Sequence, residues 1–119
     1  MSEPFTIRHE KDFEKNGKWS LVRRSLDLNA FGMNMATLQP GETIVEHDET
    51  ERNQEEVFII LNGTATMIIN GEEHEAPEGT YIRVSPEPKR NLANNGTTPV
   101  KILIVSAPCS SGYVPMEWA

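Results

Sequence analysis

The sequence lacks the features that mark several large classes of protein. Its 119 residues include a single cysteine, Cys109, which excludes an internal disulfide. No apolar run is long enough to cross a membrane, and the N-terminal segment MSEPFTIRHEKDFEKNGKW has no apolar stretch of the kind found in secretion signals. We therefore expect a soluble, cytoplasmic protein with no membrane partner.

Basic residues are also few, and they do not cluster. The chain has 11 Lys and Arg against 18 Asp and Glu, a formal net charge of -7, and its basic pairs Arg23-Arg24 and Lys89-Arg90 are isolated. Such a surface repels phosphate backbones. The sequence also has no Ser-His-Asp arrangement, no glycine-rich phosphate loop after a strand, and no aromatic platform with basic neighbours. These absences argue against nucleic-acid partners, nucleotide binding and triad-type hydrolysis.

What the sequence does contain is a series of short apolar runs separated by turn signals. The runs are rich in β-branched residues and too short for helices: VFIIL (57–61), ATMII (65–69), TYIRV (80–84) and VKILIV (100–105). Asn62-Gly63 and Asn70-Gly71, which flank the second run, are typical of β-hairpins. We therefore predict an all-β fold, either a sandwich or a jelly-roll barrel.

The length is that of a single domain with an N-terminal arm. Residues 31–119 carry the strand pattern and are predicted to form the barrel, whereas residues 1–30 are predicted to form an arm with a short helix or a swapped strand. Four apolar residues between positions 19 and 26 fall at near-helical spacing, and Ser20 is a candidate N-cap for that helix.

The run from Glu56 to Leu61 has two largely apolar faces. Glu56, Phe58 and Ile60 point one way, and the residues between them point the other way. A strand with one buried face alternates apolar and polar residues, so the second face here must be covered by another sheet or another subunit. For a chain this small we expect a homodimer.

The segment from Gly41 to Gly63, GETIVEHDETERNQEEVFIILNG, resembles the first signature motif of the cupin superfamily. Gly41, His47, Glu56 and Gly63 match the motif, and Glu49 stands where it has a second histidine. The gap between Glu49 and Glu56 is longer than usual, which indicates a loop insertion around residues 51–54. The resemblance implies a double-stranded β-helix, the jelly-roll barrel of cupins.

The segment SPEPKRNLAN is similar to the second cupin signature. Pro86 and Asn94 match it, Pro88 stands where glycine is usual, and Arg90 takes the place of the histidine. The two segments together cover residues 41–94. The chain resembles the small single-domain bacterial cupins of the cupin 2, conserved-barrel type.

In metal-bearing cupins these motifs supply three histidines and a glutamate to one divalent ion. Carried over, the resemblance implies His47, Glu49 and Glu56 as ligands, with Arg90 in the fourth position. A guanidinium has no lone pair to donate, and at about 4 Å, with an effective dielectric of about 20, it repels a divalent ion by roughly 8 kcal/mol. We therefore expect Arg90 to pair with Glu56 or Glu49, which disfavours a bound divalent metal as cofactor.

Three interpretations of this cluster stay open: a structural ion pair, a ligand site and a surviving metal site. The leading hypothesis is a protein that binds a small molecule in its barrel, anionic if Arg90 is free. The alternative is a metal-dependent enzyme of dioxygenase or isomerase type that uses His47, Glu49 and Glu56. A third is an assembly protein with a filled barrel. The sequence assigns no catalytic residue and no identified cofactor.

Three other polar residues have functional and structural interpretations. Arg83 is a candidate ligand-binding cation if the odd-numbered face of its strand looks into the barrel, and otherwise a solvated strand residue. His9 and His74 lie among charged residues, and we expect both at the surface.

Overall fold

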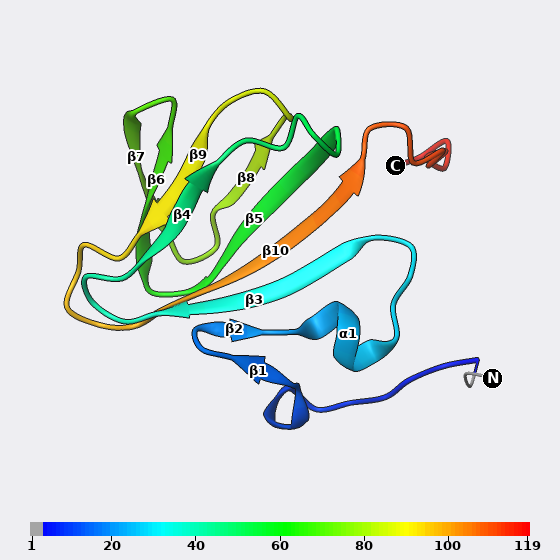
Figure 1. The fold of residues 1–119 in the computed structure, drawn as a ribbon, viewed down its shortest axis with the longest axis horizontal. Coiled ribbons are helices and arrows are strands. Elements are labelled where there is room, and N and C mark those ends of the chain that lie inside the picture. Colours follow the sequence, from blue (N-terminus) through cyan, green and yellow to red (C-terminus); the bar gives the residue numbers. More distant parts are fainter. Residues whose placement is uncertain (1–3) are drawn as a thin grey trace.

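Residues 4–119 are described by the computed structural model, and they form two antiparallel β-sheets that face each other (Figure 1). One sheet has the strand order β1-β2-β3-β10-β5-β8, and the other has the order β4-β9-β6-β7. From β1 to β10 the strands span Lys15–Asn16, Trp19–Ser20, Gly32–Leu38, Thr43–His47, Gln54–Asn62, Thr64–Ile69, Glu72–Pro77, Tyr81–Val84, Arg90–Ala93 and Val100–Pro108. The predicted all-β jelly-roll is confirmed.

The core lies between the two sheets and is built from the inward-facing row of each strand. In β5 this row is Glu56, Phe58 and Ile60, which are buried, whereas Val57 and Ile59 on the other face are only half-buried. The buried apolar cluster draws on both sheets and comprises Ala36, Leu38, Ile44, Phe58, Ile60, Ala65, Met67, Ala76, Val84, Leu92, Val100, Ile102 and Ile104.

Of the two predicted hairpins, one is confirmed and one is wrong. Asn70 and Gly71 have φ angles of 50° and 81° and join β6 to β7, which pair with each other. Asn62-Gly63 instead joins β5 in the six-stranded sheet to β6 in the four-stranded sheet. The chain therefore crosses from one sheet to the other at Gly63, whose φ of 79° allows the change of direction.

The N-terminal arm extends the six-stranded sheet. It contains η1 (Glu10–Asp12), β1 and β2, and then α1 (Val22–Leu26), which packs against β3. Strand β2 pairs with β3 of the same chain, with Trp19 opposite Ala36. The expectation that Ser20 caps the helix is wrong, because Ser20 belongs to β2 and Leu21 occupies the N-cap position. Within residues 4–119 no helix has the length and apolar character needed to cross a membrane.

Candidate functional site

Three strands bring the motif residues together at one end of the barrel. His47 ends β4 and lies opposite Arg90, the first residue of β9, in the antiparallel ladder. Glu56 lies on β5 in the other sheet, on the face that carries Phe58 and Ile60 into the core. Glu49 lies in the loop between β4 and β5, where its backbone N–H donates to the carbonyl of Pro86.

The side chains of His47, Glu49 and Glu56 converge. His47 Nε2 lies 3.4 Å from Glu49 Oε2 and 3.6 Å from Glu56 Oε1. One donor atom from each residue lies within 4.8 Å of the others. The structure thus brings together the three residues that sequence analysis selected from the first motif.

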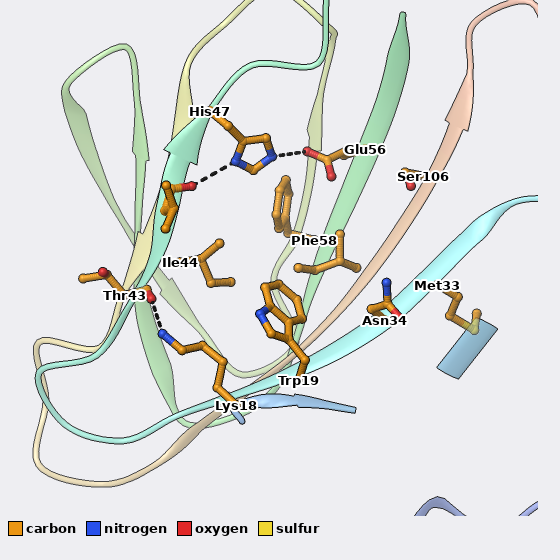
Figure 2. A pocket seen from close by; sticks show the side chains of 12 residues that line it. Lys18, Trp19, Met33, Asn34, Thr43, Ile44, His47, Glu56, Phe58 and Ser106 are labelled. Atoms are coloured by element: carbon orange, nitrogen blue, oxygen red, sulfur yellow. Dashed lines mark hydrogen bonds and ion pairs between the residues drawn. The ribbon is translucent and has the colours of Figure 1, made fainter. Parts of the chain in front are cut away.

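The backbone determines which nitrogen of His47 faces the carboxylates. His47 Nδ1 lies 2.9 Å from the carbonyl oxygen of Val45 (Figure 2). A carbonyl only accepts hydrogen bonds, so Nδ1 must carry a proton. In the neutral ring Nε2 therefore has the lone pair, and this lone pair points toward Glu49 and Glu56.

Arg90 is completely buried behind this cluster, with an exposed fraction of 0%. Its Nη1 and Nη2 donate to the carbonyls of Pro86 and Ser85, at 3.4 Å for Pro86. Its Nε lies 3.4 Å from Glu56 Oε1, yet neither atom has a hydrogen-bond partner among the described residues. The pair is therefore held by charge rather than by a hydrogen bond. The carbonyls of the loop SPEP hold the guanidinium in place.

The environment of Glu56 raises the pKa of its carboxyl group. Burial contributes most to this rise and the nearby charge of Glu49 adds to it, while Arg90 and His47 act in the opposite direction. The effect of desolvation on this pKa is thus larger than the opposing effect of the buried Arg90 guanidinium. Glu56 is the group in the cluster best suited to hold or exchange a proton.

The donor set fits a divalent metal only in part. One imidazole nitrogen and two carboxylate oxygens are ligands that iron, manganese and zinc accept, and the tautomer of His47 presents a lone pair to them. In the fourth position the cation of Arg90 lies against the same Glu56 oxygen that would bind the ion. The four-ligand site of metal-bearing cupins is therefore absent from the described residues, and what is left is a three-ligand site with a cation beside it.

Arg83 does not belong to this cluster. Its side chain is 64% exposed, and its Nη1 lies 2.9 Å from Glu55 Oε2 on the outward face of the sheet. The hypothesis of a second cation inside the barrel is therefore wrong, because β8 pairs with β5 in a register that sets Arg83 opposite the outward-facing Val57. His9 and His74 are exposed, as expected.

A cavity of about 350 Å³ opens between the two sheets beside the cluster (Figure 2). His47 and Glu56 lie at one end and Lys18 at the other, with apolar walls between them. The lining residues are Lys18, Trp19, Met33, Asn34, Thr43, Ile44, Val45, His47, Glu56, Phe58, Ile104 and Ser106. Glu49 and Arg90 are not among them, so the buried guanidinium is not free to meet an anion in this cavity.

The cavity lining also includes three polar residues that the sequence motifs do not indicate: Lys18, Asn34 and Ser106. Asn34 faces Ile104 across the β3–β10 ladder, and Ser106 shares the inward face of β10 with Ile104. A polar residue in the inward row of a strand is a signal that could have identified both. Lys18 gave no such signal, because it lies between two very short strands and reaches the cavity only through the way the arm folds back.

Comparison with known families identifies a match over most of the barrel. A family model described as a cupin domain matches residues 34–106. An uncharacterised protein of Methanocaldococcus jannaschii is 35% identical over 54 residues, which cover 45% of this chain and 43% of that protein. The chain therefore aligns with less than half the length of this curated relative.

Solved structures share the fold at low sequence identity. A cupin protein from Bacteroides fragilis superposes with a TM-score of 0.79 at 20% identity, covering 97% of this chain and 93% of that one. A predicted oxalate decarboxylase from Thermotoga maritima gives a TM-score of 0.65 at 19% identity, covering 76% and 78% of the two chains. A sugar phosphate isomerase from Silicibacter pomeroyi gives 0.67 at 18% identity, covering 75% and 57%.

Proposed function

Because the chain belongs to the cupin family, we propose that it binds a small molecule in the cavity between its two sheets. The observation that carries this proposal is the cavity itself, with apolar walls and a few polar groups at its ends. Its volume of about 350 Å³ falls in the range of small-molecule sites. A predicted oxalate decarboxylase and a sugar phosphate isomerase share this fold, which provides a precedent for a small-molecule site in it.

The cluster beside the cavity supports binding without a resident metal. Arg90 places a positive charge 3.4 Å from Glu56 Oε1, so the protein itself partly compensates this carboxylate. Glu56 and His47 line the cavity and present a carboxyl group and an imidazole to its contents. These two groups are suited to accept hydrogen bonds from a ligand.

The alternative is a metal-dependent enzyme of the dioxygenase or isomerase type. The observation that favours it is the convergence of His47, Glu49 and Glu56 within 4.8 Å. These three residues would hold the ion, which would supply Lewis-acid or oxygen chemistry next to the cavity. The roles of the surrounding residues would be to bind and orient the substrate there.

Two measurements separate the two functions. The protein is purified without chelator and without a nickel column, and it is then analysed by native mass spectrometry and by elemental analysis. A retained small molecule with no stoichiometric metal supports the binding function. One equivalent of iron, manganese or zinc would instead establish the metal-dependent alternative.

Arg90→His provides a directed test. The new imidazole would lie opposite His47 in the β4–β9 ladder and would complete a set of two imidazoles and two carboxylates. The roughly 8 kcal/mol of repulsion from the cation would also disappear. We expect divalent affinity, measured by calorimetry with manganese or zinc, to rise by orders of magnitude. Arg83→His is the matched control, because Arg83 is exposed and lies outside the cluster.

The partner that we propose for the outer face of the six-stranded sheet is a second copy of the chain. Val57 and Ile59 are half-buried on that face, and Leu61 and Tyr81 are 41% and 70% exposed. A groove lined by Val57, Val105, Phe31 and Tyr113 runs between this face and the C-terminal segment. A two-fold dimer would cover these apolar groups.

A further inference from the structure

Lys18 is a cation at the mouth of the cavity that sequence analysis did not identify. It follows the turn at Asn16-Gly17, and its Nζ donates to the carbonyl oxygen of Thr43 at 2.8 Å (Figure 2). Lys18 precedes β2 of the six-stranded sheet, and Thr43 begins β4 of the four-stranded sheet. The side chain therefore spans the open side between the sheets.

The ammonium group of Lys18 has no opposite charge beside it. In the described part of the chain no carboxylate lies within 4.0 Å of its Nζ, and its one hydrogen-bond partner there is a neutral carbonyl. A lysine has three N–H donors, so two remain for another partner. The chain carries a net charge of -7, so it has no general attraction for anions. An anion would have to be held locally, and Lys18 is the one lysine or arginine among the residues that line the described cavity.

The opposite end of the cavity, away from Lys18, disfavours an anion. His47 and Glu56 lie there, with Glu49 close behind them, so acceptor oxygens outnumber cationic groups. The one nearby cation, Arg90, is fully buried and does not reach the cavity. This end suits a hydroxyl or amino group and repels an anion.

The walls between the two ends provide apolar surface and two polar side chains that a ligand could contact. Trp19, Phe58 and Ile104 provide apolar surface. The side chains of Asn34 and Ser106 also line the cavity, and neither makes a side-chain hydrogen bond to another described residue. These two groups are available to a ligand that spans the cavity.

We propose that Lys18 is the anion anchor of this cavity and that its ligand is a small oxyanion, a carboxylate or a phosphate monoester. In this arrangement the apolar body of the ligand lies on Trp19 and Phe58, and a hydroxyl or amino group at the far end of the ligand faces Glu56 and His47. This inference rests on the proposed binding function and specifies its ligand class. Lys18 thereby takes the anion-binding role that the sequence suggested for a free Arg90.

The test uses three probes that share one body. 4-Hydroxyphenylacetate carries a carboxylate, 4-hydroxyphenyl phosphate carries a phosphate, and 4-hydroxyphenylacetamide is the neutral counterpart of the carboxylate. Binding is followed by calorimetry and by the fluorescence of Trp19 in a Trp118→Phe background. Trp118 is 84% exposed and does not line the cavity, and the chain has two tryptophans, so its replacement leaves Trp19 as the single reporter.

Lys18→Met removes the charge and keeps the apolar length of the side chain, whereas Lys18→Arg keeps the charge. Lys15→Met is the matched control, because Lys15 is an exposed lysine of the same arm that does not line the cavity. We expect wild type to bind one of the anions at least tenfold more tightly than the amide, a difference of about 1.4 kcal/mol. Lys18→Met should abolish this preference, and Lys18→Arg and Lys15→Met should retain it. Which anion is preferred distinguishes a carboxylate ligand from a phosphate ligand.

The ratio of anion to amide affinity separates anchoring from a structural role. If Lys18 only ties the two sheets together, Lys18→Met weakens all three probes equally, and the proposal is overturned. Equal binding of anions and amide by wild type overturns it as well, while leaving the cavity as a small-molecule site. If no probe binds and native mass spectrometry finds nothing retained, both this inference and the proposed function fail.

Discussion

At the scale of single residues, the site depends on one buried carboxyl group and the charges around it. Glu56 is 10% exposed in its side chain and lies between His47 and Arg90. Burial raises the pKa of Glu56, and Arg90 reverses only part of that rise. The protein therefore keeps a proton on this carboxyl at a pH where an exposed glutamate has lost it.

A raised pKa predicts a particular pH dependence of stability. The folded protein holds the Glu56 proton more tightly than the unfolded chain does. The contribution of protonated Glu56 to the free energy of unfolding is therefore fully present below the ordinary pKa of 4.5 and is lost as pH rises through the folded pKa. Glu56→Gln removes this loss. We expect the free energy of unfolding of Glu56→Gln, relative to wild type, to rise as pH increases above 4.5 and to level off once the folded pKa of Glu56 is passed.

Urea unfolding of metal-free protein at a series of pH values measures this trend. Glu55→Gln is the control, because it removes a carboxylate from the exposed face of the same strand. A relative stability of Glu56→Gln that is independent of pH, or no steeper than that of Glu55→Gln, would contradict the assignment. It would mean that the carboxyl is solvated.

At the scale of elements, the crossing from β5 to β6 determines how the two sheets are joined. β5 carries Glu56 in one sheet, and β6 pairs with β9, which carries Arg90, in the other. Gly63 makes this crossing with φ of 79°, and a Cβ placed on it would lie 2.6 Å from the carbonyl oxygen of Pro99. Both the backbone conformation and the available space require glycine.

Gly63→Ala should therefore destabilise the protein by about 2–5 kcal/mol, from about 1–2 for the left-handed conformation and about 1–3 for the steric overlap. Gly71→Ala is the matched control. Its φ is 81°, and no atom lies within 4 Å of its added Cβ, so only the conformational cost of about 1–2 kcal/mol applies. Chemical denaturation measures both variants. Equal losses of stability for Gly63→Ala and Gly71→Ala would contradict the steric argument, because they would show that the backbone near Pro99 moves away from the added Cβ at no cost in free energy.

At the scale of the whole molecule, the outer face of the six-stranded sheet and the two ends of the chain leave large apolar side chains at the surface. In the C-terminal segment Tyr113, Val114, Met116 and Trp118 are all more than 60% exposed. Figure 1 shows this segment projecting beyond the end of β10. A chain of 119 residues gains from covering such groups by association.

We predict that the chain sediments at twice its mass of 13.4 kDa at micromolar concentration. Val57→Glu places a charge on the outward face of β5 and should raise the dimer dissociation constant by about 100-fold or more, without unfolding the barrel. Val45→Glu is the control, because Val45 is 79% exposed on β4 in the other sheet. A wild-type chain that sediments as a monomer would rule out the dimer.

Local sequence was sufficient for the fold class and for part of the site. The alternation in β5 depends only on the geometry of an extended chain, so it predicted that Glu56 shares a face with Phe58 and Ile60. The positive φ that Asn and Gly tolerate predicted the turn at Asn70-Gly71. The spacing of the two motifs selected His47, Glu49 and Glu56, which the structure brings together.

The remaining features depend on contacts between segments that are distant in the sequence. Whether Asn62-Gly63 closes a hairpin or crosses between sheets depends on which strands pair, and the pairing of β5 with β10 and β8 decides it. The same register turns Arg83 outward. Lys18 meets Thr43 across the cavity only because the arm folds onto β3. Residue type determines local conformation, whereas burial and the direction in which a side chain faces follow from packing. The sequence by itself therefore determined a β-barrel with an acidic, histidine-bearing motif. The tertiary structure decided which charged side chains face its cavity.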